Sequence, residues 1–171
     1  MHEMSHIIET TDIDAAGRPF EFAAEGAQRQ ALAARLGLLD LRKLTVTGHI
    51  RRDGDGQTIL IEGRFLAEVE QKCVVTLEPI ETTLDEAFQV TFLSPADWET
   101  YRARDVEVVP DDEDVEPLEG TSVDLGATVA EYLALAIDPY PRHQDAEFSF
   151  DTGVEADPGP FAALAKLRNK V

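Results

Sequence analysis

The stretch KLTVTGHIR, residues 43–51, alternates apolar or glycine positions with polar ones over its whole length. This period of two is typical of a β-strand with one buried face, because successive side chains point to opposite sides of a sheet. The residues DGDG, 53–56, follow it and tolerate the left-handed backbone conformations of a tight turn. The sequence therefore predicts a strand followed by a hairpin, from which the neighbouring elements can be placed.

A second, longer strand is predicted to return from this turn. Charged side chains occupy most of its even positions, and its odd positions carry the apolar set Ile59, Ile61, Phe65, Ala67, Val69, Cys73, Val75 and Leu77. We expect a bend at Gly63 or near Gln71, and we expect Pro79 to end the strand because proline cannot donate to a sheet ladder. The alternation then resumes in a third strand at Leu84, Phe88, Val90 and Phe92. Three successive strands of this kind form an antiparallel meander with one buried face.

Two helices are predicted, one before and one after the meander. Residues 25–39 are rich in helix-forming residues, and Gly37 is expected to end this helix, whose apolar side chains recur at Leu32, Leu36 and Leu39. Asp124 is a suitable N-cap for a second helix over residues 125–137. Its apolar stripe comprises Leu125, Val129, Leu133 and Ile137.

These elements predict an α+β fold, an antiparallel β-meander sheet packed by two or three helices, in a single domain over residues 1–171. Two short strands are expected over residues 7–22. A polar tail is expected over residues 144–171, with a short helix at 161–167 that carries the only basic end of the molecule. The pattern is compatible with an open sheet and with one that closes toward a barrel.

Residues 105–119, DVEVVPDDEDVEPLE, contain eight acidic residues and two prolines but no lysine or arginine. Like charges at this density cannot bury enough apolar surface to order a segment, so an acidic mobile loop is expected. A short edge strand within it is a further option at Val106, Val108 and Val109.

The net charge of the whole chain restricts its partners. Acidic residues number 34 against 15 basic ones, which gives a formal net charge of −19. This charge repels DNA and anionic membranes and attracts basic proteins, although it is also compatible with a role in solubility alone. No apolar run approaches the roughly 20 residues that span a bilayer, and the N-terminus lacks the pattern of a secretory signal. With a single cysteine and no internal disulfide, a cytoplasmic protein is expected.

Cys73 is the natural candidate for chemistry, but its position favours packing. Its parity places it on the core side, where an apolar setting would raise the pKa of the thiol and make it a poor nucleophile. The four histidines show no metal-ligand spacing and no second cysteine exists, so no metal or cofactor site is predicted.

Two charged clusters are candidate functional sites. Glu78, Asp85 and Glu86 surround Pro79 and could act as acid and base, but solvated turn residues are the better interpretation in so acidic a chain. Glu86 shares parity with the apolar positions, so partial burial is expected there. Basic residues gather in the two long strands and could form an RNA-binding face at Lys43, Arg51, Arg64 and Lys72. Acidic residues share that face and no aromatic residues interleave to stack bases, so a mixed, solvated face is favoured.

The stretch QKCVVTLEPI, residues 71–80, resembles the YceD family, the large ribosomal RNA subunit accumulation proteins, in the form found in alphaproteobacteria. That family is marked by a strand that ends in a cysteine and by a following Leu-Glu-Pro turn, here Cys73, Leu77, Glu78 and Pro79. Three further stretches are similar and occur in the same order: ALAARLGLLDL, VDLGATVAEYLALAIDPYPR and PFAALAKL. Many relatives carry a second cysteine where this chain has Thr76, so metal or redox chemistry through such a pair is not open to it.

The resemblance implies a non-enzymatic cytoplasmic factor that supports the accumulation of large-subunit ribosomal RNA, with no established binding or catalytic residues to transfer. Together with the net charge, it favours a basic ribosomal protein or assembly factor as partner, with ribosomal RNA contacted indirectly. The candidate partner-binding residues are Asp111, Asp112, Glu113 and Asp114. Two alternatives stay open: a direct RNA-binding module on the basic sheet face, and an enzyme with a carboxylate site near Glu78 and Glu86.

Overall fold

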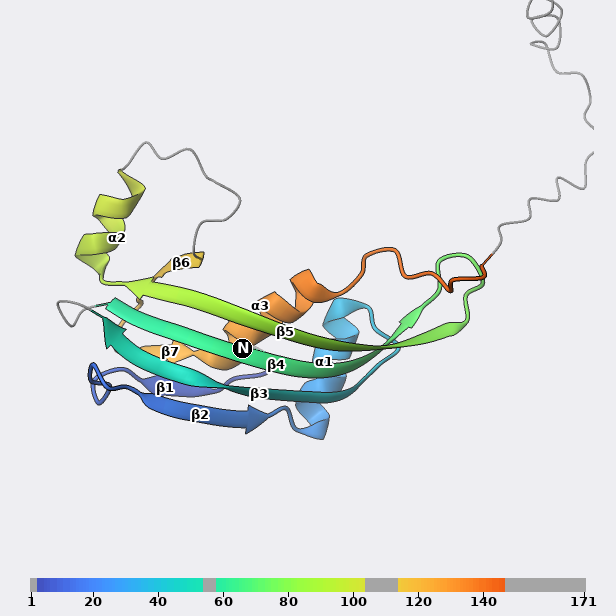
Figure 1. Cartoon of the computed structure of the whole chain (residues 1–171), viewed down its shortest axis with the longest axis horizontal. Helices are drawn as coiled ribbons and strands as arrows, with labels where there is room; N and C mark the ends of the chain where they lie inside the picture. Colours follow the sequence, from blue (N-terminus) through green and yellow to red (C-terminus); the bar gives the residue numbers. More distant parts are fainter. Residues whose placement is uncertain (1–2, 54–57, 104–113, 147–171) are drawn as a thin grey trace, which may run out of the picture.

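The structure is a computed structural model that describes residues 3–53, 58–103 and 114–146. Within these residues the elements follow in the order β1 (Ile7–Glu9), β2 (Arg18–Ala23), α1 (Gly26–Leu36), β3 (Asp40–Asp53), β4 (Thr58–Lys72), β5 (Pro79–Leu93), α2 (Pro95–Arg102), β6 (Asp114–Pro117), β7 (Ser122–Asp124) and α3 (Leu125–Ala136). The main sheet has the strand order β2-β3-β4-β5-β6, and β1 pairs separately with β7 (Figure 1). All these pairings are antiparallel except the one between β5 and β6.

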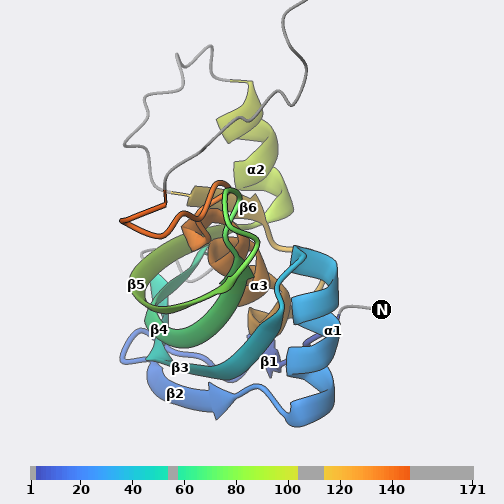
Figure 2. The same ribbon diagram turned by 90° about the vertical axis from the view of Figure 1, so that its right-hand side faces the viewer.

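The core lies on the face of the sheet formed by the odd positions of β4. Ile61 pairs with Ile50 of β3 and Val90 of β5, and all three side chains are completely buried. Helices α1 and α3 cover this same side of the curved sheet (Figure 2). The apolar stripe of α3 supplies the buried side chains Leu125, Val129 and Leu133.

Both helices begin or end where local chemistry requires it. Gly37 adopts the left-handed conformation, with φ of 68°, and closes α1 as predicted, because glycine has no Cβ to oppose it. Asp124 caps α3 as predicted: its carboxylate accepts hydrogen bonds from the backbone N–H groups of Gly126 at 3.0 Å and Ala127 at 3.4 Å.

The prediction of an α+β fold built on a meander is confirmed, since β3, β4 and β5 are consecutive antiparallel neighbours. The sheet is open in the described residues, with β2 and β6 at its edges. The two short strands expected over residues 7–22 are also present as β1 and β2. They do not pair with each other, however, because β1 pairs with β7 and β2 with β3.

The predicted end of the second long strand is wrong. β4 ends at Lys72, and Pro79 pairs with Lys72 as the first residue of β5. The intervening residues form the connecting turn, which the backbone N–H of Cys73 closes by donating to the carbonyl oxygen of Glu78 at 2.8 Å. Because proline is accepted at the first position of a strand, the Leu-Glu-Pro sequence leads into β5 rather than terminating β4. No register shift marks the bend expected at Gly63, since β4 pairs continuously with β3 and with β5 on both sides of this residue.

Other differences lie outside the meander. Leu39 follows α1 and is 51% exposed, so it does not belong to the helix stripe. Asp114–Pro117 form β6, so the prediction of a mobile loop over 105–119 is wrong for these four residues, and residues 105–113 lie outside the described part of the chain. Several predicted features lie outside the described residues, namely the turn residues 54–56, the edge strand at 106–109 and the helix at 161–167.

No helix in the described part of the chain is long and apolar enough to cross a membrane.

Gly63 provides a test of how tightly the core face is packed. A Cβ atom at this position would lie 2.4 Å from the ring of Phe88, so Gly63→Ala should lower the free energy of unfolding by about 1–3 kcal/mol through overpacking. Urea denaturation measures this loss. Gly26→Ala is the matched control, because no atom lies within 4 Å of its added Cβ and alanine favours a helix. Equal stability of the two variants would show that the Phe88 ring can move aside without cost.

Candidate functional site

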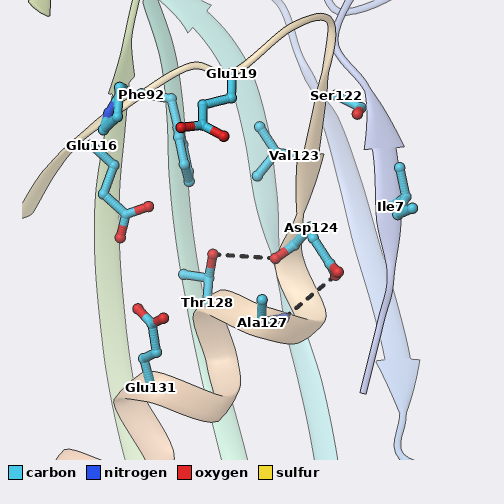
Figure 3. Close-up of a pocket in the computed structure, with 11 residues that line it drawn as sticks. Ile7, Phe92, Glu116, Glu119, Ser122, Val123, Asp124, Ala127, Thr128 and Glu131 are labelled. Carbon is cyan, nitrogen blue, oxygen red and sulfur yellow. Dashed lines mark hydrogen bonds between the residues drawn. The ribbon is translucent and has the colours of Figure 1, made fainter. Parts of the chain in front are cut away.

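A pocket of about 360 Å³ opens where the N-terminal end of α3 meets β6, β7 and the last residues of β5 (Figure 3). It is lined by Ile7, Phe92, Glu116, Pro117, Glu119, Ser122, Val123, Asp124, Ala127, Thr128 and Glu131. Phe92 and Val123 are buried and supply apolar surface, and Ile7 on β1 is 63% exposed. Four of the lining residues carry carboxylates, and none of these described lining residues is a lysine or arginine. We call this site the acidic pocket.

Asp124 is the carboxylate that builds the acidic pocket. Besides capping α3, it accepts hydrogen bonds from the backbone N–H of His6 and the hydroxyl of Ser5, both at 2.8 Å. Burial raises the pKa of Asp124, but these hydrogen bonds outweigh burial and hold it below its usual range. The ionised carboxylate therefore attaches the N-terminal segment to the start of α3 and is already occupied by protein donors.

Glu116 has the opposite environment. Its side chain points into the same space as that of Glu131 (Figure 3). Burial raises the pKa of Glu116, and the negative charges of Glu131 and Asp114 raise it further. Since no cation lines the pocket among the described residues, a positive group from outside would relieve this repulsion.

Asp114, the only one of the four predicted partner-binding residues that the structure describes, has a structural role. The hydroxyl of Tyr132 on α3 donates to the Asp114 carboxylate and lies 2.8 Å from the carbonyl oxygen of Gln89 on β5. Burial, the Asp114 hydrogen bond and nearby carboxylates all raise the pKa of Tyr132, so the hydroxyl stays protonated. This contact holds β6 against α3 and thereby positions Glu116. Asp111, Asp112 and Glu113 lie outside the described residues.

Sequence reasoning missed the pair formed by Glu116 and Glu131. Glu116 belonged to the acidic segment but was not singled out, and Glu131 was one polar residue of a predicted helix. The proximity of these two carboxylates depends on the parallel contact between β5 and β6, which no local sequence pattern predicts.

The thiol of Cys73 is buried as predicted, but its surroundings are polar. The backbone N–H of Thr76 donates to the Cys73 sulfur at 3.4 Å. Burial raises the pKa of the thiol, but hydrogen bonds from the Thr76 side chain and from the backbones of Thr76, His143 and Val75 outweigh burial and lower it to about 6. The expectation of a raised pKa is therefore wrong, because the turn folds its N–H groups around the sulfur.

The basic sheet face is neutralised by neighbouring carboxylates. Arg64 forms an ion pair with Asp85 on the next strand, and this hydrogen bond holds the pKa of Asp85 below its usual range. Arg51 pairs with Asp53 at 2.9 Å. Lys43 lies directly opposite Glu68, and Lys72 stands at the end of β4. The four candidate RNA-binding residues thus share a face whose arginines are already paired.

The carboxylates near Pro79 do not form a catalytic pair. Glu78 lies in the turn and Glu86 lies eight positions further along the extended chain, which separates them by about 25 Å at the rise of a β-strand. Both side chains are exposed, so the partial burial expected for Glu86 is wrong. Among the described residues, no three histidines, cysteines or carboxylates are grouped so that they could hold a metal ion.

Comparison with known proteins identifies the family. A family model described as "Large ribosomal RNA subunit accumulation protein YceD" matches residues 61–168, well over half of the chain. The chain belongs to the YceD family. The matched range contains the Cys73 turn and most of the acidic pocket, but not β1 with Ile7. The description of the family names accumulation of the large ribosomal RNA subunit. No curated protein and no solved structure matches the chain.

The raised pKa of Glu116 predicts a pH-dependent stability. At neutral pH the unfolded chain carries ionised Glu116 without cost, whereas the folded protein carries it partly buried and beside the negative charges of Glu131 and Asp114. Glu116→Gln should therefore increase the urea midpoint at about pH 7, and the gain should shrink as pH falls through about 4.5 and vanish at about pH 3, where the carboxyl is protonated in both states. Glu119→Gln, which removes an exposed charge from the same pocket, is the control. A gain of equal size at both pH values would contradict repulsion as the cause.

The Cys73 turn predicts a second pH dependence, of opposite sign. Because folding lowers the pKa of this thiol from 9.0 to about 6, its contribution to stability should be absent below about pH 6, rise with pH between those two values and be complete above pH 9. Ultraviolet titration of thiolate absorbance should place the native pKa in the same region. Thr76→Val removes the hydroxyl donor and should move the thiol pKa upward, while Cys73→Ala should abolish the slope. A native thiol that titrates at its ordinary value would contradict the hydrogen-bond arrangement.

Proposed function

We propose that this YceD-family protein supports large-subunit ribosomal RNA accumulation by binding a basic ribosomal protein or assembly factor, without catalysing a reaction. The observation that carries the proposal is Glu116, a partly buried carboxylate that faces Glu131 and Asp114 with no lysine or arginine among the described lining residues. A basic partner side chain that enters the acidic pocket relieves this repulsion.

The pocket has the composition that a lysine or arginine side chain needs. The carboxylates of Glu116, Glu119 and Glu131 offer acceptors for its charged end, and Phe92 and Ile7 offer apolar surface for its methylene stem. Asp111, Asp112 and Glu113 directly precede β6 in sequence, and their negative charge adds to the long-range attraction of a basic surface. In this proposal the partner, in the cytoplasm, carries the contact to ribosomal RNA.

Direct RNA binding has less support. Arg51 and Arg64 would have to exchange their carboxylate partners for phosphates, within the field of a chain of net charge −19. An enzyme site at Glu78 and Glu86 also has less support, because both side chains are exposed and neither lines the pocket described on this stretch of β5, whose carboxylates are Glu68 and Glu81.

Binding measurements with charge variants test the proposal. Glu116→Gln combined with Glu131→Gln should weaken association with purified basic large-subunit proteins at least about tenfold, a loss of about 1.4 kcal/mol, and should reduce its salt dependence. Glu21→Gln combined with Glu62→Gln removes the same charge from exposed strand positions and should have little effect. Binding that both pairs of substitutions weaken equally would point to net charge alone.

The acidic residues that precede β6 in sequence are tested by a separate variant. Replacing Asp111, Asp112 and Glu113 by serine removes three charges and leaves Asp114, whose contact with Tyr132 holds β6. Weaker binding with a slower association rate is expected. Unchanged, salt-insensitive binding by this variant and by the pocket variant would exclude the acidic surface as the contact.

A further inference from the structure

Exposed apolar side chains gather at the end of the sheet where β4 and β5 join. Val74, Leu77 and Tyr140 are 48%, 62% and 74% exposed, and we call these three the turn patch. The segment after α3 lies against the turn, because the backbone N–H of Val74 donates to the carbonyl oxygen of Pro141 at 2.9 Å. Figure 1 shows this segment beside the β4–β5 turn, at the opposite end of α3 from the acidic pocket.

The side chain of Leu77 is exposed although the backbone N–H of this residue is held in the turn by a hydrogen bond to the carbonyl oxygen of Cys73 at 3.0 Å. Its φ of 64° makes it the single non-glycine residue with a left-handed backbone in that part of the chain. This conformation is unfavourable for leucine, because the Cβ crowds the carbonyl that follows it. Since the side chain is also mostly in water, a strained and exposed leucine indicates a contact surface.

The rim of the turn patch differs from the acidic pocket. Glu78 and Asp138 adjoin it, and so do the basic residues Lys72 and Arg142. Charge therefore does not select a basic partner here as it does at the acidic pocket. The occupant must be recognised through apolar contact.

We infer that the turn patch is the docking site of this chain's own C-terminal segment, residues 160–168, with the sequence PFAALAKLR. Phe161, Leu164 and Leu167 recur at the spacing of one helix face, which supplies the apolar stripe that the patch lacks. The segment belongs to the same chain, so its docking needs no partner protein. This inference therefore does not depend on the proposed function.

The length of the chain and the place where it leaves the described residues support this occupant. Pro141 contacts the turn, and the described chain ends five residues later at Ala146. Residues 147–160 can span about 45 Å when extended, so the C-terminal segment reaches the patch without displacing any described element. A tether of this length holds the segment at an effective concentration of the order of millimolar. The family match also ends at Arg168, so it includes both the turn and the C-terminal segment.

A tryptophan reporter tests the inference in the full-length protein. Trp98 is the only tryptophan, so Trp98→Phe combined with Phe161→Trp places the single indole in the C-terminal segment. Docking should shift its emission to shorter wavelength and reduce acrylamide quenching several-fold relative to a free peptide of residues 156–171 carrying the same Phe161→Trp change. Emission and quenching identical to those of the peptide would overturn the inference.

Variants of the patch identify the site of docking. Leu77→Glu in the reporter protein should return emission and quenching to the peptide values. Ile7→Glu is the matched control, since Ile7 is equally exposed at 63% but lies at the other end of α3, and it should change neither. Leu77→Asn should also release the segment, and it keeps the turn folded because asparagine tolerates a left-handed backbone. Protection that survives both Leu77 variants would overturn the patch as the site.

The same reporter separates this chain's own segment from that of a second copy. Docking within one chain should give emission that does not change with protein concentration and a monomer mass in sedimentation. Blue-shifted emission that appears only as dimers form would overturn docking within the chain and assign the patch to exchange between two copies.

Discussion

The odd-numbered side chains of β4 pack between two neighbouring strands and the two helices, and this contact determines where every larger element lies. Ile61, Phe65, Ala67 and Val69 are at most 1% exposed, and β3 and β5 pair with β4 along almost its whole length. With one face of the meander committed to the core, the opposite face must be polar. The charged residues of β3 to β5 consequently face water and one another, as Arg64 and Asp85 do.

The acidic pocket depends on how α3 is fastened to this sheet. Asp124 fixes the first turn of the helix to the N-terminal segment, and Tyr132 fixes its middle to β5 and β6. Between these two attachments the helix presents Glu131 toward Glu116. Asp124 and Asp114 therefore use their charge for structure, which leaves the repulsion of the remaining carboxylates uncompensated.

Strand alternation and helix caps were sufficient to predict β3, β4, β5, α1 and α3, because each is long and has one buried face. β6 was not predicted, because three of its four residues are charged or proline and because it joins the sheet through a parallel pairing with β5. The lowered pKa of Cys73 was not predicted for a related reason. Parity indicates that a side chain is buried but not which backbone N–H groups the turn directs at it. The proximity of Glu116 to Glu131 could not be predicted either, because it depends on how β6 and α3 lie relative to each other, and the sequence pattern of each element says nothing about the other.

The open sheet has one further consequence, at its edges. β2 exposes Arg18, Pro19 and Glu21, and β6 is four residues long and contains Asp114, Glu116 and Pro117. Prolines and charges on such short edges oppose the addition of another strand. These two edges of the main sheet therefore disfavour both the addition of a strand from a partner and edge-to-edge aggregation.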